Sequence, residues 1–247
     1  MPATRASAVL LCLTVMAGLL ATGCSGDKDE TGPSPSPSTG PSGTPPPVFT
    51  LEQVETALLT RGDYGKNWAV PAPERRRTSL VKKQIETCTY GKLDPPGTPQ
   101  FAAQQYSEKS GRLDGGNRSE LIMVYPTAEE ASGAFARTQE KLKDCRPKKR
   151  VPPSPIPSST RFLASFDATW TPTEEPIGEW RRSGGLQKGV YSTYIKHNIA
   201  YTFFDYALRG NVLVSSIYWQ ATEPRTKVDP IKKRAEELLT KQLERIG

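Results

Sequence analysis

The stretch AYTFFDYALRGNVLVSSIYW, residues 200–219, decides the fold class. Ala200–Leu208 and Val212–Trp219 are rich in aromatic and β-branched side chains, which favour strands. Arg209-Gly210-Asn211 between them is typical of a tight hairpin turn. The stretch therefore predicts two antiparallel strands that are neighbours in one sheet.

Further strands are predicted on the N-terminal side of this hairpin. They are Phe162–Trp170 and Val190–His197, with two earlier strands between Phe101 and Tyr125, the second of them Ser119–Tyr125. Ser183-Gly184-Gly185 is typical of a turn. Residues 146–159 contain five prolines and are predicted to form a loop.

Three helices are predicted around these strands. The first follows a capping box at Thr50–Gln53 and runs to about Thr60, where the segment 61–65 stops it; the RGD tripeptide there is attributed to chance. The second starts after Thr127 and reaches Cys145, and the third is capped by Asp229, with Pro230 at its first position. The apolar face of the third helix is formed by Ile231, Ala235, Leu238, Leu239, Leu243 and Ile246.

This order of elements predicts the fold class. Few connections between the late strands are long enough to hold a crossover helix, so a doubly wound parallel sheet is disfavoured. The sequence predicts an α+β domain over residues 49–247, with an antiparallel β-sheet and helices packed on it.

The N-terminal residues 1–23 have the layout of a lipoprotein signal peptide. Arg5 precedes an apolar run that is shorter than the roughly 20 residues needed to span a membrane. Leu20-Ala21-Thr22-Gly23-Cys24 resembles a bacterial lipobox, which makes Cys24 the predicted lipidation site. The alternative is cleavage by an ordinary signal peptidase, which would release a secreted chain.

Residues 24–48 are predicted to be a disordered Pro/Ser/Gly-rich tether. Seven prolines lie between Ser25 and Pro47, and they bias the segment towards extended polyproline II. A proline-recognition ligand is the alternative interpretation. The chain is thus expected on the extracytoplasmic face of the cell membrane, held by its lipid.

Cys88 and Cys145 are the cysteines that remain in the predicted domain. A pair of cysteines in an exported chain indicates a disulfide, with two separate buried thiols or a metal pair as alternatives. A metal site has little support, because the chain holds one histidine and no Cys-x-x-Cys spacing. No metal or other cofactor is predicted.

Three stretches together resemble a known family. They are Leu51–Leu59 with Asp63-Tyr64-Gly65 and Trp68, Tyr125 leading into Glu129-Glu130-Ala131 and Leu142–Cys145, and Leu208–Val214. This combination resembles the extracellular sensor domain of actinobacterial PknH-like Ser/Thr kinases, a domain that also occurs in free-standing lipoproteins. The resemblance implies a mixed α/β domain with an antiparallel sheet and a ligand-binding cleft. Those domains typically carry two disulfides, whereas this chain can form only one.

No catalytic residue is predicted. The sequence has no Gly-x-Ser-x-Gly, no Walker loop and no Rossmann fingerprint. His197 is the only imidazole and lies beside Asn198 at a predicted strand end, a position more typical of a hairpin turn than of a general base. We therefore expect a non-catalytic protein, with an extracytoplasmic hydrolase as a distant alternative.

A ligand site is predicted among the aromatic residues of the late strands. Two-residue alternation sends half of them to each sheet face, so that one face forms core and the other is left for a ligand. The predicted ligand-binding residues are Tyr191, Tyr194, Tyr201, Asp205 and Trp219. The expected ligand is a small molecule, a glycan or a lipid. Core packing alone is the alternative explanation of these aromatic side chains.

The net charge of +7 favours partners that carry negative charge. Export excludes nucleic acid as a partner, whereas anionic wall polymer or a membrane partner would suit the basic runs. These runs are 75–77, 82–83, 148–150 and 232–234. The sequence thus predicts a non-catalytic envelope lipoprotein that binds or senses a ligand, with an accessory protein contacting wall polymer as the alternative.

Overall fold

The computed structural model describes residues 45–73, 76–109, 115–155, 162–192 and 196–247. The chain divides into two units, Met1–Gly43 and Thr44–Gly247, and every described residue belongs to the second. The predicted signal peptide, Cys24 and most of the predicted tether therefore lie outside the described residues, and so does Tyr194.

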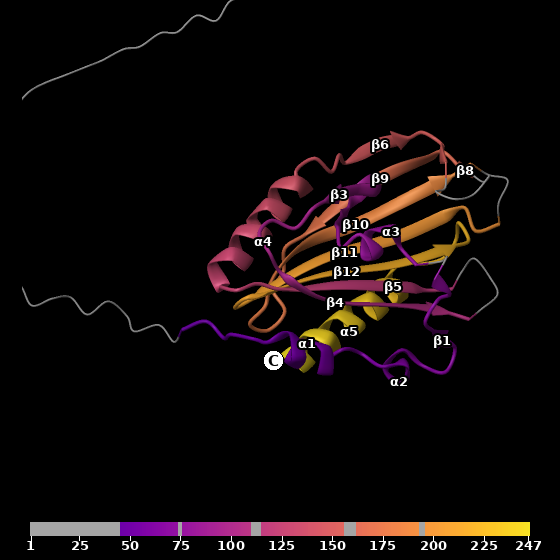
Figure 1. Cartoon of the computed structure of the whole chain (residues 1–247). Coiled ribbons are helices and arrows are strands. Elements are labelled where there is room, and N and C mark those ends of the chain that lie inside the picture. The colour runs from indigo at the N-terminus through magenta and orange to yellow at the C-terminus, as the bar shows by residue number, and fades with distance from the viewer. Residues whose placement is uncertain (1–44, 74–75, 110–114, 156–161, 193–195) are drawn as a thin grey trace, which may run out of the picture. The chain divides into compact units, whose positions relative to one another are not determined.

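The second unit is built on an eight-stranded antiparallel sheet with the strand order β1-β4-β5-β12-β11-β10-β9-β6 (Figure 1). The strands are β1 (Trp68–Ala69), β4 (Gln100–Glu108), β5 (Asn117–Val124), β12 (Val212–Thr222), β11 (Ile199–Arg209), β10 (Arg181–Tyr191), β9 (Phe166–Thr173) and β6 (Lys148–Val151). Two small hairpins pair β2 (Ile85–Thr87) with β3 (Gly91–Leu93) and β7 (Ser154–Pro155) with β8 (Phe162–Leu163). The predicted α+β class is confirmed.

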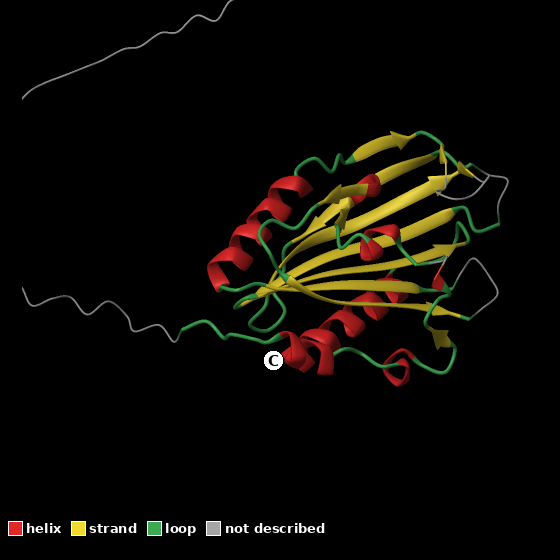
Figure 2. Ribbon diagram, in the orientation of Figure 1, coloured by secondary structure: helices red, strands yellow, loops and turns green. Residues whose placement is uncertain are grey.

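Helices cover both faces of this sheet (Figure 2). They are α1 (Leu51–Thr56), α2 (Arg61–Tyr64), α3 (Thr78–Val81), α4 (Ala128–Leu142) and α5 (Asp229–Ile246). We call the side that carries α4, α3 and the β2–β3 hairpin the α4 face, and the side that carries α1 and α5 the α5 face. In Figure 1, α3 lies in front of the sheet and α5 lies behind it.

The alternation of β11 explains why both faces need a cover. Phe204, Tyr206 and Leu208 pack on the α4 face beside Phe135 of α4, because successive side chains of a strand point to opposite sides. The intervening residues of β11 pack under α5 on the other face. Every residue from Ile199 to Leu208 is buried, so the sheet has core on both sides, where the sequence suggested one core face and one open face.

A row of polar side chains crosses the sheet on the α5 face. Gln104, Glu120, Ser216 and Asp205 are partners in register across β4, β5, β12 and β11. The carboxylate of Glu120 binds Arg118 Nη2, and both of these side chains are completely buried. Four neighbouring strands thus carry polar groups beneath a helix, where water cannot solvate them.

A second buried ion pair lies at the end of this row. Arg182 Nη2 lies 2.6 Å from Asp205 Oδ1, and each side chain is 7% exposed. Burial raises the pKa of Asp205, and the neighbouring Arg182 partly offsets this effect. A helix residue completes the row, since Gln104 Nε2 donates to Gln242 Oε1 of α5 at 3.1 Å. The polar row thereby joins the sheet to α5.

The predicted disulfide is confirmed between Cys88 and Cys145, with a Cα–Cα distance of 5.9 Å. Cys88 begins a short 3-10 turn, Cys88–Tyr90, that connects β2 to β3. Cys145 follows the end of α4. The bond therefore fixes the β2–β3 hairpin to α4 on the same face of the sheet.

Two predictions about the late strands are wrong. Of the predicted strand Val190–His197, only Val190 and Tyr191 lie in a strand, the end of β10 (Arg181–Tyr191); His197 lies in a bend before β11, and residues 193–195 lie outside the described part of the chain. The predicted turn at Ser183-Gly184-Gly185 lies within β10, where the glycines make room for neighbours. A Cβ at Gly185 would lie 2.5 Å from the Trp170 ring, and one at Gly184 would lie 2.0 Å from the carbonyl oxygen of Phe204.

The predicted loop over residues 146–159 is also wrong in part, because it contains β6 and β7. Pro147 and Pro152 flank β6 rather than interrupt it. As an edge strand, β6 needs hydrogen-bond partners on one side only, and these come from β9. The remaining residues, 156–159, lie outside the described part of the chain.

The first helix is shorter than predicted, because α1 ends at Thr56. Beyond it, Gln242 of α5 donates from Nε2 to the carbonyl oxygen of Ala57 and accepts at Oε1 from the Leu59 N–H. These bonds take the place of the backbone hydrogen bonds that Ala57 and Leu59 would form in a longer α1. Thr60 then caps α2, so the segment predicted as a turn is a helical turn that begins at Arg61.

The third helix confirms its predicted apolar face, whose six residues are all buried. Its cap position is Val228, and Asp229 is the first helical residue rather than the cap.

We predict that Glu120→Gln lowers the free energy of unfolding by about 3–5 kcal/mol, because it leaves the buried guanidinium of Arg118 without a counter-charge. Urea unfolding measures this loss. The matched control is Asp167→Asn in the exposed pair with Arg150, which we expect to cost less than about 1 kcal/mol. Equal losses in the two variants would contradict the structural role of the buried pair.

Candidate functional site

A cavity of about 190 Å³ lies on the α4 face, between the central strands and the β2–β3 hairpin. Its lining combines aromatic rings, small residues and a few polar groups. The lining residues are Arg77, Glu86, Tyr90, Gln187, Gly189, Tyr191, Ala200, Thr202, Phe204 and Trp219. We call it the aromatic cavity. A larger hollow of about 510 Å³ between α4 and β9–β10 is more open and includes the exposed Glu140 of α4 and Lys143 just after it.

Strand alternation and register create the floor of the aromatic cavity. Gln187, Thr202 and Trp219 are partners across β10, β11 and β12, so their side chains form one row on the α4 face. Gly189 pairs with Ala200 in the next row towards Tyr191. A Cβ at Gly189 would lie 3.0 Å from the Phe166 ring, so this glycine makes room for that ring beside the cavity, and Ala200 adds only a methyl group to the floor.

The wall opposite the sheet is the segment that follows Cys88. Thr89 and Tyr90 have φ angles of 52° and 63°, a left-handed conformation that costs non-glycine residues roughly 1–2 kcal/mol each. Several contacts hold it in place besides the disulfide. Gln187 Oε1 accepts from the Thr89 N–H at 2.6 Å, and Lys149 Nζ donates to Thr89 Oγ1 at 3.3 Å. Surrounding structure that enforces unfavourable backbone angles is a feature of binding sites.

This conformation brings Tyr90 against Tyr191. The two hydroxyl oxygens are 3.5 Å apart, and the Tyr90 and Phe166 rings pack edge to face at a centroid distance of 5.8 Å. Burial raises the pKa of Tyr191, and the nearby Tyr90 adds to this shift. Burial also raises the pKa of Tyr90. Both phenols therefore stay protonated at neutral pH and act as neutral hydrogen-bonding groups.

An ion pair closes one end of the cavity. Arg77 Nη1 lies 2.9 Å from Glu86 Oε1, and the Ser79 hydroxyl donates to Glu86 Oε2 at 2.8 Å. Glu86 is 8% exposed, so its charge is compensated within the protein. Within the described part of the chain, no acceptor bonds to the other two guanidinium nitrogens of Arg77, which leaves them available to a ligand.

The structure brings together some of the predicted ligand residues and separates others. Tyr191 and Trp219 both line the aromatic cavity. The side chains of Tyr201 and Asp205 point to the other side of the sheet, the α5 face. There Tyr201 packs in the core and Asp205 pairs with Arg182. Tyr194 lies outside the described residues. Ligand binding by Tyr191 and Trp219 stays a prediction.

Sequence reasoning missed Glu86, Tyr90 and Gln187. Glu86 and Tyr90 flank Cys88, and the expected disulfide was the available signal, because it ties this segment to the helix that covers the sheet. Gln187 gave no signal, since its position on the α4 face follows from a strand, β10, that the sequence did not predict with the right bounds.

The other polar candidates of the sequence do not form a catalytic or metal group with the cavity. His197 Nε2 lies 3.9 Å from Glu223 Oε1, and Lys196 pairs with the same carboxylate at 3.0 Å. Over the described ranges, no three His, Cys, Asp or Glu residues are grouped so that they could hold a metal ion. No helix in these ranges is long and apolar enough to cross a membrane.

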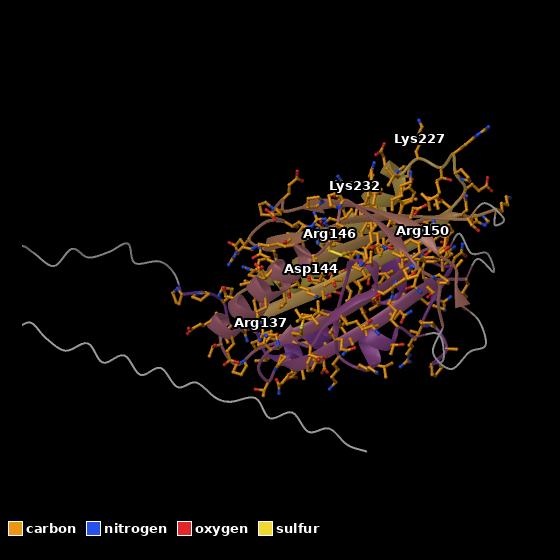
Figure 3. All side chains as sticks on the ribbon, turned by 90° about the horizontal axis from the view of Figure 1, so that it is seen from above. Arg137, Asp144, Arg146, Arg150, Lys227 and Lys232 are labelled. Carbon is orange, nitrogen blue, oxygen red and sulfur yellow. A yellow bond between two sulfur atoms is a disulfide. The ribbon has the colours of Figure 1, made fainter. Side chains whose placement is uncertain are left out.

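The basic runs lie on different elements. Residues 148–150 form most of the edge strand β6, and residues 232–234 lie in the first turns of α5. Figure 3 shows Arg150 and Lys232 on the side that is seen from above, both exposed. Arg77 of the first run faces the aromatic cavity, while Arg75 lies outside the described residues.

This arrangement of sheet and helices has a counterpart among solved structures. The crystal structure of the extracellular domain of PknH from Mycobacterium tuberculosis is similar to this chain with a TM-score of 0.51 and 11% sequence identity, over 82% of this chain and 100% of that domain. The two chains share a fold. The resemblance inferred from the sequence is thereby confirmed at the level of the fold.

A second solved structure, a putative uncharacterized protein from Mycobacterium smegmatis that is an ortholog of Rv0999, has a TM-score of 0.39 and 14% identity over 81% of this chain and 98% of that chain. No family model and no curated protein sequence matches the chain.

We predict that the double variant Cys88→Ala/Cys145→Ala loses about 4 kcal/mol of unfolding free energy, because the bond closes a long loop in the unfolded chain (sequence separation 57). Urea unfolding of the oxidised parent and the variant measures the loss. The parent under reducing conditions should match the variant, and a parent that is equally stable with and without reductant would contradict the prediction.

Proposed function

We propose that this protein is a non-catalytic extracytoplasmic domain that binds or senses a ligand in the aromatic cavity. The observation that carries the proposal is the cavity itself, a preformed hollow in which apolar rings surround a few convergent polar groups. The left-handed Thr89–Tyr90 segment, fixed by a disulfide and by Gln187, supports a binding role because the fold maintains an unfavourable local conformation there.

The chemistry of the cavity favours binding over catalysis. Its tyrosines are neutral at physiological pH, so neither is a phenolate nucleophile. The carboxylate of Glu86 already accepts from Arg77 and Ser79, which opposes a role as a free general base. The fold shared with an extracellular domain agrees with a binding role but does not define one, since one fold hosts many functions.

We also propose that a lipid on Cys24 holds the domain at the outer face of the cell membrane. The lipobox-like sequence before Cys24 supports this, and so does the disulfide, because such bonds persist in oxidising compartments. A diacylated cysteine provides two apolar chains, which suffice for stable attachment.

We expect cells expressing the parent chain to incorporate labelled palmitate into it, and the Cys24→Ala variant to carry no label, because the thiol is the proposed acceptor. Gel autoradiography of membrane and medium fractions measures both proteins. Cys12→Ala, which changes a cysteine within the predicted signal peptide, is the matched control and should retain the label. Equal labelling of parent and Cys24→Ala would refute the anchor.

We expect native mass spectrometry of the full chain, extracted from membranes, to detect a copurified small molecule that is absent from Tyr191→Ala and from Trp219→Ala, because both side chains line the cavity. Val190→Ala is the control, because the exposed Val190 is next to Tyr191 in β10 and its side chain points to the sheet face opposite the cavity. A ligand retained by both cavity variants would contradict the site. Binding only to isolated wall, abolished by salt on the order of a few hundred millimolar, would instead support contact through the basic runs.

A further inference from the structure

We propose that the ligand of the aromatic cavity is a neutral carbohydrate, of which one sugar ring occupies the hollow. This inference rests on the proposed function and goes beyond it by naming the ligand class. Three properties of the cavity carry it: its volume, the pairing of aromatic faces with hydroxyl-compatible polar groups, and the opposite charges of Arg77 and Glu86, which cancel among the lining residues that the structure describes.

The volume limits the occupant to a unit of about one ring. Sites for drug-sized molecules usually measure roughly 300–1,000 Å³. At about 190 Å³ the aromatic cavity is smaller than these. An acyl chain needs a longer and wholly apolar path, whereas a single ring of a larger glycan fits with the rest of the glycan outside.

The aromatic walls suit the C–H faces of a sugar ring. Tyr90, Tyr191 and Trp219 line the cavity and are each partly exposed, so their ring faces are not wholly covered by the protein. The face of an aromatic ring carries partial negative charge and attracts the polarised C–H groups of a pyranose. A purely aliphatic ligand would gain burial here but would leave the polar groups unpaired.

The polar groups offer both donors and acceptors, as hydroxyl groups require. Within the described part of the chain, the Thr202 hydroxyl has no protein partner, and Gln187 uses its Oε1 for the Thr89 N–H while its amide nitrogen stays available. Arg77 adds two unengaged guanidinium nitrogens. A sugar hydroxyl can donate to one of these residues and accept from another, so neighbouring hydroxyls satisfy the whole set.

The charges in the cavity cancel within the protein. The positive charge of Arg77 lies against the negative charge of Glu86, and both tyrosines are neutral. A charged ligand would lose hydration without meeting an uncompensated counter-charge. This balance favours a neutral sugar over an anionic or cationic ligand.

The test is saturation-transfer NMR of the full chain in a detergent without a sugar head group, with the methyl glycosides of glucose, galactose, mannose and N-acetylglucosamine as probes. We expect at least one probe to receive saturation at its ring protons. Trp219→Ala should abolish the transfer by removing an aromatic wall. Thr202→Val, which keeps the shape of the side chain, should weaken the Kd by about 2- to 10-fold through the loss of one hydrogen bond.

Val190→Ala is the control and should bind like the parent, and thermal unfolding verifies that each variant is folded. Transfer that persists unchanged in Trp219→Ala and Thr202→Val would overturn the proposal. If no probe binds and native mass spectrometry finds a cavity-dependent ligand that is not a carbohydrate, the carbohydrate inference fails while the proposed function stands. If no probe binds and no cavity-dependent ligand exists, both fail.

Discussion

The register between β11 and β12 is the constraint on which the rest of the structure depends. It places Asp205 opposite Ser216 and, through β5, in line with Glu120, so that both buried carboxylates meet arginines beneath α5. A shift of one residue would exchange the two faces of the sheet and move Asp205 into the apolar core under α4. Because a buried charge without a partner is costly, the ion pairs oppose any other register.

The same register creates the aromatic cavity on the opposite face. Gln187, Thr202 and Trp219 meet in one row because β10, β11 and β12 are aligned as they are. Gly189 makes room for the Phe166 ring beside the cavity, and Ala200 adds only a methyl group to its floor. The buried ion pairs and the cavity thus lie on opposite faces of the same strands, and one pairing decides both.

The disulfide adds the part of the site that the sheet cannot provide. It holds the segment after Cys88 against the sheet, although the backbone angles of Thr89 and Tyr90 are unfavourable. A loop held only by side-chain contacts would relax to a more common conformation and move Tyr90 away from Tyr191. The bond therefore contributes to the geometry of the cavity as well as to stability.

The fold shared with the extracellular domain of PknH describes the architecture of the chain, whereas the side chains that line the cavity determine which ligand it can bind. These are separate questions, because function depends on particular side chains placed on a fold. In this chain, the polar lining includes Arg77 and Glu86, which are near one another in the sequence, and Gln187, which is about 100 residues further on. The cavity's chemistry must therefore be argued from its own residues.

The sequence by itself determined the elements whose signals are local. The hairpin at 200–219 follows from strand-forming residues around Gly210, and the apolar face of α5 follows from helical spacing. The pairing of Cys88 with Cys145 was also predictable, since two cysteines remained in the predicted domain. Alternation further predicted that the aromatic residues of the late strands divide between two faces.

Only the tertiary structure decided which of these faces holds the cavity and which residues complete it. Tyr191 and Trp219 reach the α4 face, whereas Tyr201 and Asp205 reach the α5 face, because register across four strands is set by packing at a distance. The glycines of β10 gave a turn signal in isolation, yet they lie in a strand because Trp170 and the backbone of Phe204 fill the space beside them. Close packing between segments far apart in the sequence leaves no local signal, and this is the physical reason why the sequence could not assign the site.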